Sequence, residues 1–153
     1  MIKNLLILFF VVAISACGGG DSDSGDMLEA TLPGTNVPIS FVGTYEGTLN
    51  ITASAAGTTI SDSFPITVTV NDDATIRFDG DDPDETFTVG LQNDGVFQGS
   101  LPLDQSGCSG NVGVSGVVDG TNVTGTLEGT GECDVSGLSV GVELTGDFSA
   151  ARI

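Results

Sequence analysis

The chain has 153 residues and a formal charge of -18 at pH 7, from 21 acidic residues and three basic ones. Such a charge repels nucleic acid and favours cationic partners or divalent ions. The length provides for one domain with a modest core. Because the sequence has no histidine and a single lysine at position 3, the usual bases of serine and cysteine catalysis are missing, and we expect no enzyme activity.

The first residues have the composition of a leader peptide. Lys3 supplies a positive charge, and Leu5 to Ile14 form an unbroken apolar stretch of about ten residues. A transmembrane helix needs roughly 20 residues, so this stretch is short for one. Cleavage of the leader is therefore expected, and a retained N-terminal anchor is the alternative.

The stretch ends in Ile14-Ser15-Ala16-Cys17, a branched aliphatic residue followed by two small residues and a cysteine. This pattern resembles the lipobox of bacterial lipoprotein precursors, over residues 1–17. The resemblance implies cleavage before Cys17, a diacylglycerol thioether on its sulfur and a third acyl chain on its new amino group. Because Gly18 is not the aspartate that commonly retains enterobacterial lipoproteins in the inner membrane, the resemblance favours an outer-membrane anchor in the cell envelope.

Composition then divides the chain into three parts. Residues 1–16 are the expected signal peptide. Residues 17–38 are rich in Gly, Ser, Asp, Thr and Pro, which is typical of a flexible tether that carries the lipid. Residues 39–153 are the expected single domain, in which apolar residues alternate with polar ones at the period of a β-strand.

The alternation predicts about eight strands joined mostly by tight turns. Asn93-Asp94-Gly95 is a strong hairpin signal, and Asp119-Gly120-Thr121-Asn122 predicts another turn. An antiparallel meander closed into a small barrel is the expected all-β fold, and a two-sheet β-sandwich is the alternative. Closure would pair the first strand with the last and leave no long exposed edge. The expected strands are 41–53, 60–70, 76–78, 87–91, 97–103, 112–118, 123–129 and 138–148.

Two short segments resemble the glycine-x-aromatic turns of lipocalin-like and other lipoprotein barrels. They are Gly43-Thr44-Tyr45 near the first strand and Gly146-Asp147-Phe148 in the last. The resemblance is short and implies no particular ligand.

Two cysteines remain besides the one in the lipobox. If Val118 pairs with Val123 across the turn, the same register places Cys108 directly opposite Cys133. An even pair in an exported chain predicts a disulfide. Zinc is a poor alternative, because two cysteines without histidine make an incomplete site.

The densest acidic stretch lies between two expected strands and is a weak candidate for calcium binding. Carboxylates in a loop suit calcium, but the spacing does not match an EF-hand loop and Pro83 interrupts it. A solvated connecting loop is the simpler interpretation, so no cofactor is expected. The candidate ligands are Asp79, Asp81, Asp82, Asp84 and Glu85.

Three hypotheses for function follow from these patterns. The first is a non-catalytic structural or interaction module whose acidic surface binds a cationic protein partner. The second is a lipocalin-like carrier of a small apolar ligand, although an eight-stranded barrel can be filled by its own side chains. The third is a calcium-dependent surface module. We expect a monomer that contacts the membrane through its lipid and binds no nucleic acid. The aromatic residues expected to fill the core are Phe41, Tyr45, Phe64, Phe78, Phe87, Phe97 and Phe148.

Overall fold

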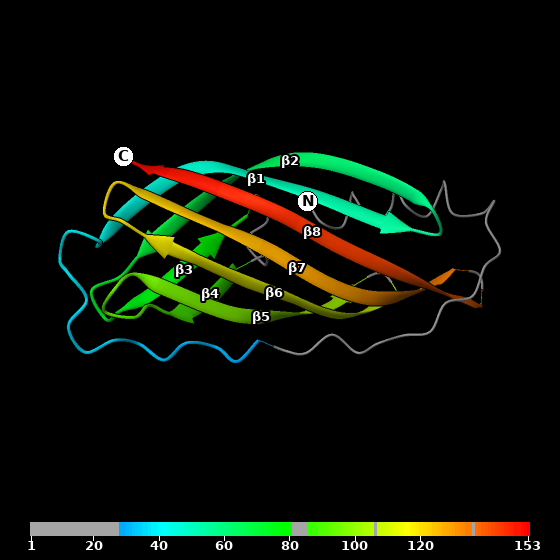
Figure 1. Cartoon of the computed structure of the whole chain (residues 1–153), viewed down its shortest axis with the longest axis horizontal. Coiled ribbons are helices and arrows are strands. Elements are labelled where there is room, and N and C mark those ends of the chain that lie inside the picture. The colour runs from blue at the N-terminus through cyan, green and yellow to red at the C-terminus, as the bar shows by residue number, and fades with distance from the viewer. Residues whose placement is uncertain (1–27, 81–85, 106, 136) are drawn as a thin grey trace.

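The expected eight strands are present in the computed structural model, which describes residues 28–80, 86–105, 107–135 and 137–153 (Figure 1). Each strand lies close to its predicted range, and several extend farther because residues beyond the predicted ranges also pair with the neighbouring strand. The strands are β1 (Gly43–Ala55), β2 (Thr58–Val70), β3 (Thr75–Asp79), β4 (Thr86–Gly90), β5 (Val96–Gln105), β6 (Cys108–Val118), β7 (Asn122–Val135) and β8 (Leu138–Arg152).

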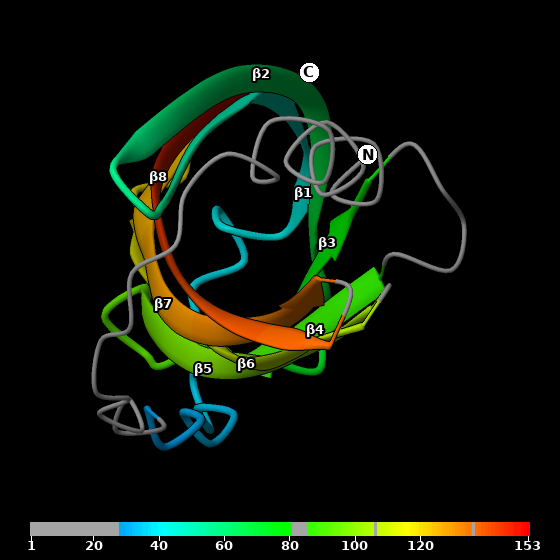
Figure 2. The same cartoon turned by 90° about the vertical axis from the view of Figure 1, so that its right-hand side faces the viewer.

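The strands form one antiparallel sheet that curls into a barrel, with the order β4-β3-β2-β1-β8-β7-β6-β5. Viewed along its axis, the sheet nearly closes on itself (Figure 2). The first strand pairs with the last, from Tyr45 opposite Arg152 to Ala55 opposite Val142. The predicted barrel is therefore confirmed. It differs from the expected closed form because one pair of neighbouring strands is not joined by a backbone ladder, and we call this place the seam.

The seam lies between β4 and β5. The Asn93-Asp94-Gly95 turn forms, with the N–H of Gly95 donating to the carbonyl of Gln92 at 3.0 Å and a φ of 86° at Gly95. The N–H of Gln92 also donates to the carbonyl of Val96 at 2.9 Å. Beyond this turn no backbone ladder joins β4 to β5 among the described residues, so the predicted turn is confirmed and the expected pairing of the two strands is wrong. The strands meet through side chains instead: a Cβ added to Gly99 would lie 3.0 Å from the Phe87 ring.

Residues 28–36, the seam segment, run along the outside of this seam and bond to both strands (Figures 1 and 2). The N–H of Thr31 donates to the carbonyl of Gln98 on β5 at 2.8 Å, and its hydroxyl donates to the carbonyl of Gly90 on β4. The N–H of Gly34 donates to the carbonyl of Leu91 at 2.8 Å. Backbone groups that an adjacent strand would satisfy are thus satisfied by this segment. It belongs to the stretch expected to be a tether, whose residues 17–27 lie outside the described part.

In the half of the barrel that contains Tyr45, glycines pair with aromatic residues. Phe97 lies opposite Gly116, and Phe148 lies opposite Gly125. A Cβ at Gly116 would come within 2.6 Å of the Phe97 ring, and one at Gly125 within 2.4 Å of the Phe148 ring. The glycines therefore leave the space that the rings occupy, which permits a tightly coiled sheet.

The chain before β1 closes this end of the barrel. Val37 and Phe41 pack against the core, and the buried Tyr45 hydroxyl donates to the carbonyl of Phe41 at 2.6 Å. Burial raises the pKa of Tyr45, while the nearby Arg152 opposes that shift. The Arg152 guanidinium donates to the carbonyls of Ser40, at 2.5 Å, and Val42, at 2.6 Å. This end is therefore sealed by side chains and by backbone hydrogen bonds.

Candidate functional site

An apolar cavity of about 420 Å³ occupies the barrel on the side away from the sealed end. Its wall comes from all eight strands. Leu49 and Ile51 of β1 and Phe64 and Ile66 of β2 form one side. The remaining apolar wall consists of Phe78, Phe87, Leu101, Leu103, Val112, Val114, Leu127, Leu144 and Phe148.

The cavity exists because two strands are short. β3 and β4 have five residues each, and β2 pairs with β3 only from Thr67 to Val70. Beyond that point no described strand covers the outer edge of β2, and the lining residues at the rim come from β2, the ends of β3 and β4, and β5. The mouth therefore lies between β2 and β5, where the β3–β4 hairpin ends.

A proline stands on each side of the mouth. Pro65 on β2 and Pro102 on β5 are both exposed and both line the cavity. Proline has no backbone N–H and cannot donate to an added strand, so it is confined to edges and bulges of sheets. These two residues oppose pairing of β2 with β5, which would otherwise cover the mouth.

Phe78 stands at the centre of the aromatic floor. Its ring centroid lies 5.9 Å from that of Phe87, 5.6 Å from that of Phe97 and 5.4 Å from that of Phe148. Such separations are typical of favourable tilted and edge-on aromatic pairs. The expectation that the seven aromatic residues pack in the core is confirmed, since each belongs to one of the two core clusters or packs against one. Four of these aromatic residues also border the cavity: Phe64, Phe78, Phe87 and Phe148.

Asp79, a polar residue in the described lining of the cavity, forms an ion pair with Arg77. The Nε–H of Arg77 donates to Oδ1 of Asp79, on the same strand, at 2.8 Å. The Nη2 atom of Arg77 lies 2.7 Å from the same oxygen. The hydroxyl of Thr86 donates to that oxygen at 3.2 Å. Asp79 is thus held by neighbouring side chains, and the pair is half exposed, so it contributes little to stability.

Asp79 is the one weak calcium candidate whose surroundings the structure describes. The other four, Asp81, Asp82, Asp84 and Glu85, lie outside the described residues. Within the described ranges, no group of three or more His, Cys, Asp or Glu side chains is arranged to hold a metal ion. Calcium binding stays a prediction.

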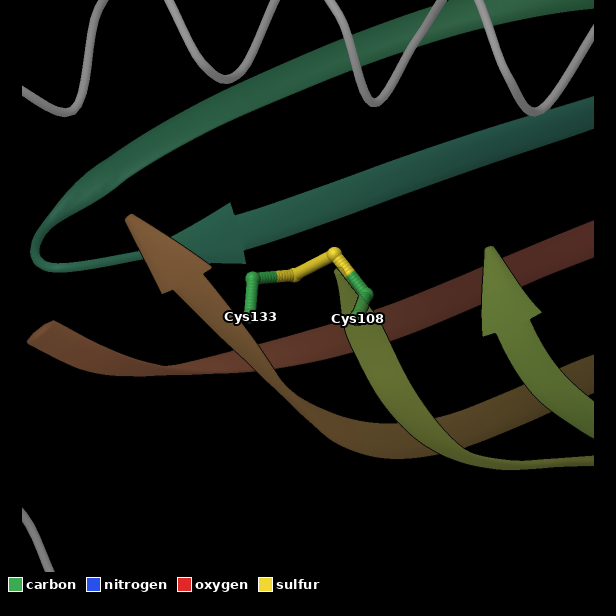
Figure 3. The surroundings of a disulfide bond; sticks show 2 residues. All are labelled: Cys108 and Cys133. Carbon is green, nitrogen blue, oxygen red and sulfur yellow. A yellow bond between two sulfur atoms is a disulfide. The ribbon is translucent and has the colours of Figure 1, made fainter. Parts of the chain in front are cut away.

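The disulfide predicted between Cys108 and Cys133 is confirmed (Figure 3). The two residues lie directly opposite each other on β6 and β7, in the register that places Val118 opposite Val123. Their sulfurs are bonded at 2.06 Å and their Cα atoms lie 3.9 Å apart. The bond joins the strand ends farthest from the Asp119–Asn122 turn and packs with Leu103 and Val142 in the second core cluster of the barrel.

The lipidation site predicted from the leader, Cys17, lies outside the described residues, as does Gly18. No helix in the described part of the chain is long and apolar enough to cross a membrane. Lipidation, the outer-membrane location and the absence of enzyme activity therefore stay predictions.

Comparison with known proteins does not assign the chain to a family. No protein-family model matches the chain, and no curated protein is detectably similar to it in sequence. The argument for function therefore depends on the geometry of the cavity. Sequence reasoning considered an apolar ligand but nominated no site for it, because alternation identifies the inward face of a strand without showing how far its side chains fill the space.

Proposed function

We propose that the protein binds a small apolar ligand in this cavity, as a non-catalytic carrier whose barrel is anchored in the bacterial envelope by the lipid that the leader implies. The observation that carries the proposal is a cavity of about 420 Å³ with an almost entirely hydrocarbon wall. Binding sites for small molecules are typically concave, mostly apolar and between about 300 and 1,000 Å³.

The composition of the wall defines what the site would bind. Inward-facing side chains such as Leu49, Phe64 and Leu127 offer no hydrogen bonds, and the backbone groups of the paired strands are used in their ladders. Affinity would come from removal of apolar surface from water. A ligand burying roughly 250 Å² would gain about 6 kcal/mol at 25 cal/mol/Å², which corresponds to a dissociation constant of some tens of micromolar. Ordering costs reduce this value.

The test is titration with the neutral apolar dye N-phenyl-1-naphthylamine, whose fluorescence rises in an apolar site. Leu144 lines the cavity, whereas Leu138 on the same strand is exposed and lies outside the lining. We expect Leu144→Trp to fill part of the cavity and weaken dye binding at least fivefold, and Leu138→Trp to leave it unchanged. Equal effects of the two variants, or no saturable binding by the native chain, would refute the proposal.

A second candidate is the interaction module with a cationic partner, favoured by the acids on the outer face of β1, β7 and β8. Glu46, Glu128, Glu143 and Asp147 are all exposed there. Binding to a cationic probe such as polylysine should weaken steeply as salt rises, because exposed charges are screened. Binding that persists at 0.5 M salt would contradict this alternative. The monomeric state stays a prediction.

A further inference from the structure

Asp62 interrupts the apolar face of β2. It lies opposite Ile51, which is buried, and therefore has the inward register that it shares with Phe64 and Ile66. Phe64 and Ile66 line the cavity. Asp62 is the inward position next to Phe64, on the side of the β1–β2 turn, and is not itself among the lining residues. Its side chain is exposed, with Oδ1 accepting a hydrogen bond from the N–H of Ser63 at 2.8 Å. An exposed carboxylate is therefore one inward position away from the lining residue Phe64, on the strand that forms one side of the mouth.

The cation nearest to the rim is already engaged. Arg77 is paired with Asp79 through two nitrogens, at 2.8 and 2.7 Å, and Asp79 also accepts a hydrogen bond from Thr86. To neutralise an incoming carboxylate, Arg77 would have to leave this pair, and Asp79 would then lose its counter-charge.

The other arginine cannot serve the cavity. Arg152 lies at the sealed end, where its guanidinium donates to the carbonyls of Ser40, Val42 and Gly120. The sequence contains only one further cation, Lys3, in the expected signal peptide. The charge of the whole chain, -18, adds a field that repels anions.

We propose that the cavity selects amphiphiles by head-group charge, binding uncharged or cationic single-chain molecules and discriminating against carboxylates such as fatty acids. This inference rests on the proposed function, because it concerns the same cavity. The apolar wall takes the hydrocarbon chain and has no partner for a buried head group, which therefore stays at the mouth. There, Asp62 attracts a cation and repels an anion.

The experiment is displacement of N-phenyl-1-naphthylamine by three ten-carbon competitors, decyltrimethylammonium, decanol and decanoate, at pH 8 and below their micellar concentrations. At pH 8 the carboxyl group of decanoate is fully ionised. We expect decanoate to bind about threefold to tenfold more weakly than decyltrimethylammonium at 20 mM salt, and the difference to shrink at 0.5 M salt.

Two variants with the same change of net charge test the position of the charge. Asp62→Lys places a cation at the mouth and should raise the affinity for decanoate relative to decyltrimethylammonium at least threefold. Asp72→Lys makes the same substitution in the β2–β3 turn at the sealed end and should leave the ratio within twofold of the native one. Retention of dye binding and of the native circular dichroism spectrum shows that each variant is folded.

The outcomes separate the two proposals. If the native chain does not bind the dye, the proposed function fails, and this inference fails with it. If the dye binds but decanoate displaces it as well as decyltrimethylammonium at low salt, or if the two lysine variants shift the ratio equally, the apolar site stands and the charge selection is refuted.

Discussion

Loss of the disulfide should destabilise the barrel by several kilocalories per mole. Cys108 and Cys133 close a loop with a sequence separation of 25 residues. In the chain-entropy description, a loop of this length removes about 12 cal/mol/K from the unfolded chain, or about 3.5 kcal/mol at 25 °C. That is a large share of the roughly 5–15 kcal/mol by which domains are typically stable.

Besides stabilising the whole barrel, the disulfide should stabilise the strand ends around it in particular. It lies in the half of the barrel away from the sealed end, where its core cluster includes the small side chains Ala53 and Ala55. The shorter strands β3 and β4 do not extend over this half. After reduction, amide hydrogen exchange should therefore accelerate first near Cys108 and Cys133, and later near Val118, beside the turn.

Urea unfolding followed by far-ultraviolet circular dichroism measures the effect, since the sequence has no tryptophan. We expect reduction to lower the unfolding free energy by about 3–4 kcal/mol and the melting temperature by about 10–15 °C. The Cys108→Ala/Cys133→Ala variant should lose a similar amount, and reduced native protein is its control because it retains both sulfurs. A loss below about 1 kcal/mol in both samples would refute the reasoning.

Three further predictions concern the seam and the sealed end. Gly90→Ala should lower the free energy of unfolding in urea by about 1–3 kcal/mol, because its Cβ would lie 2.3 Å from the Thr31 carbonyl oxygen. Gly141→Ala is the control, since a Cβ there would have nothing within 4 Å, and equal losses of stability in the two variants would contradict the prediction. Tyr45→Phe should cost about 1–2 kcal/mol by leaving a main-chain carbonyl unpaired, and a neutral result would show that this bond adds no stability. Asp119 accepts hydrogen bonds from the Thr121 side chain and from neighbouring backbone N–H groups, which lower its pKa from 3.8 to about 2. Because the unfolded chain binds this proton more readily, the contribution of Asp119 is complete above pH 3.8 and is lost as the pH falls toward 2. Carbon-detected NMR titration should find that midpoint, and a value near 3.8 would contradict the turn geometry.

Much of the fold can be predicted from the sequence because antiparallel pairing is governed by local rules. A period of two identifies the strands, and the turn at Asp119–Asn122 sets the register of β6 against β7. That register determines the pairing of Cys108 with Cys133, which the structure contains. The pairing of β1 with β8 follows from the need to protect two sheet edges.

The hairpin expected at Asn93-Asp94-Gly95 shows where local rules stop. The turn forms as its residues require, but the strands on either side do not pair. Their free backbone groups bond instead to Thr31 and Gly34, which lie about 60 residues earlier in the chain. A composition typical of a tether gives no sign of this contact, because hydrogen bonds to a distant strand edge need no apolar periodicity.

By itself, the sequence determined the all-β class, the approximate strands, the register of one hairpin and its disulfide, because each depends on side-chain alternation and short-range turn chemistry. Only the tertiary structure decided that β3 and β4 end early, that the seam segment bonds across β4 and β5, and that a cavity remains among the inward side chains. The physical reason is that inward-facing residues are specified one strand at a time. The volume they enclose depends on how all eight strands curl and on where each one stops.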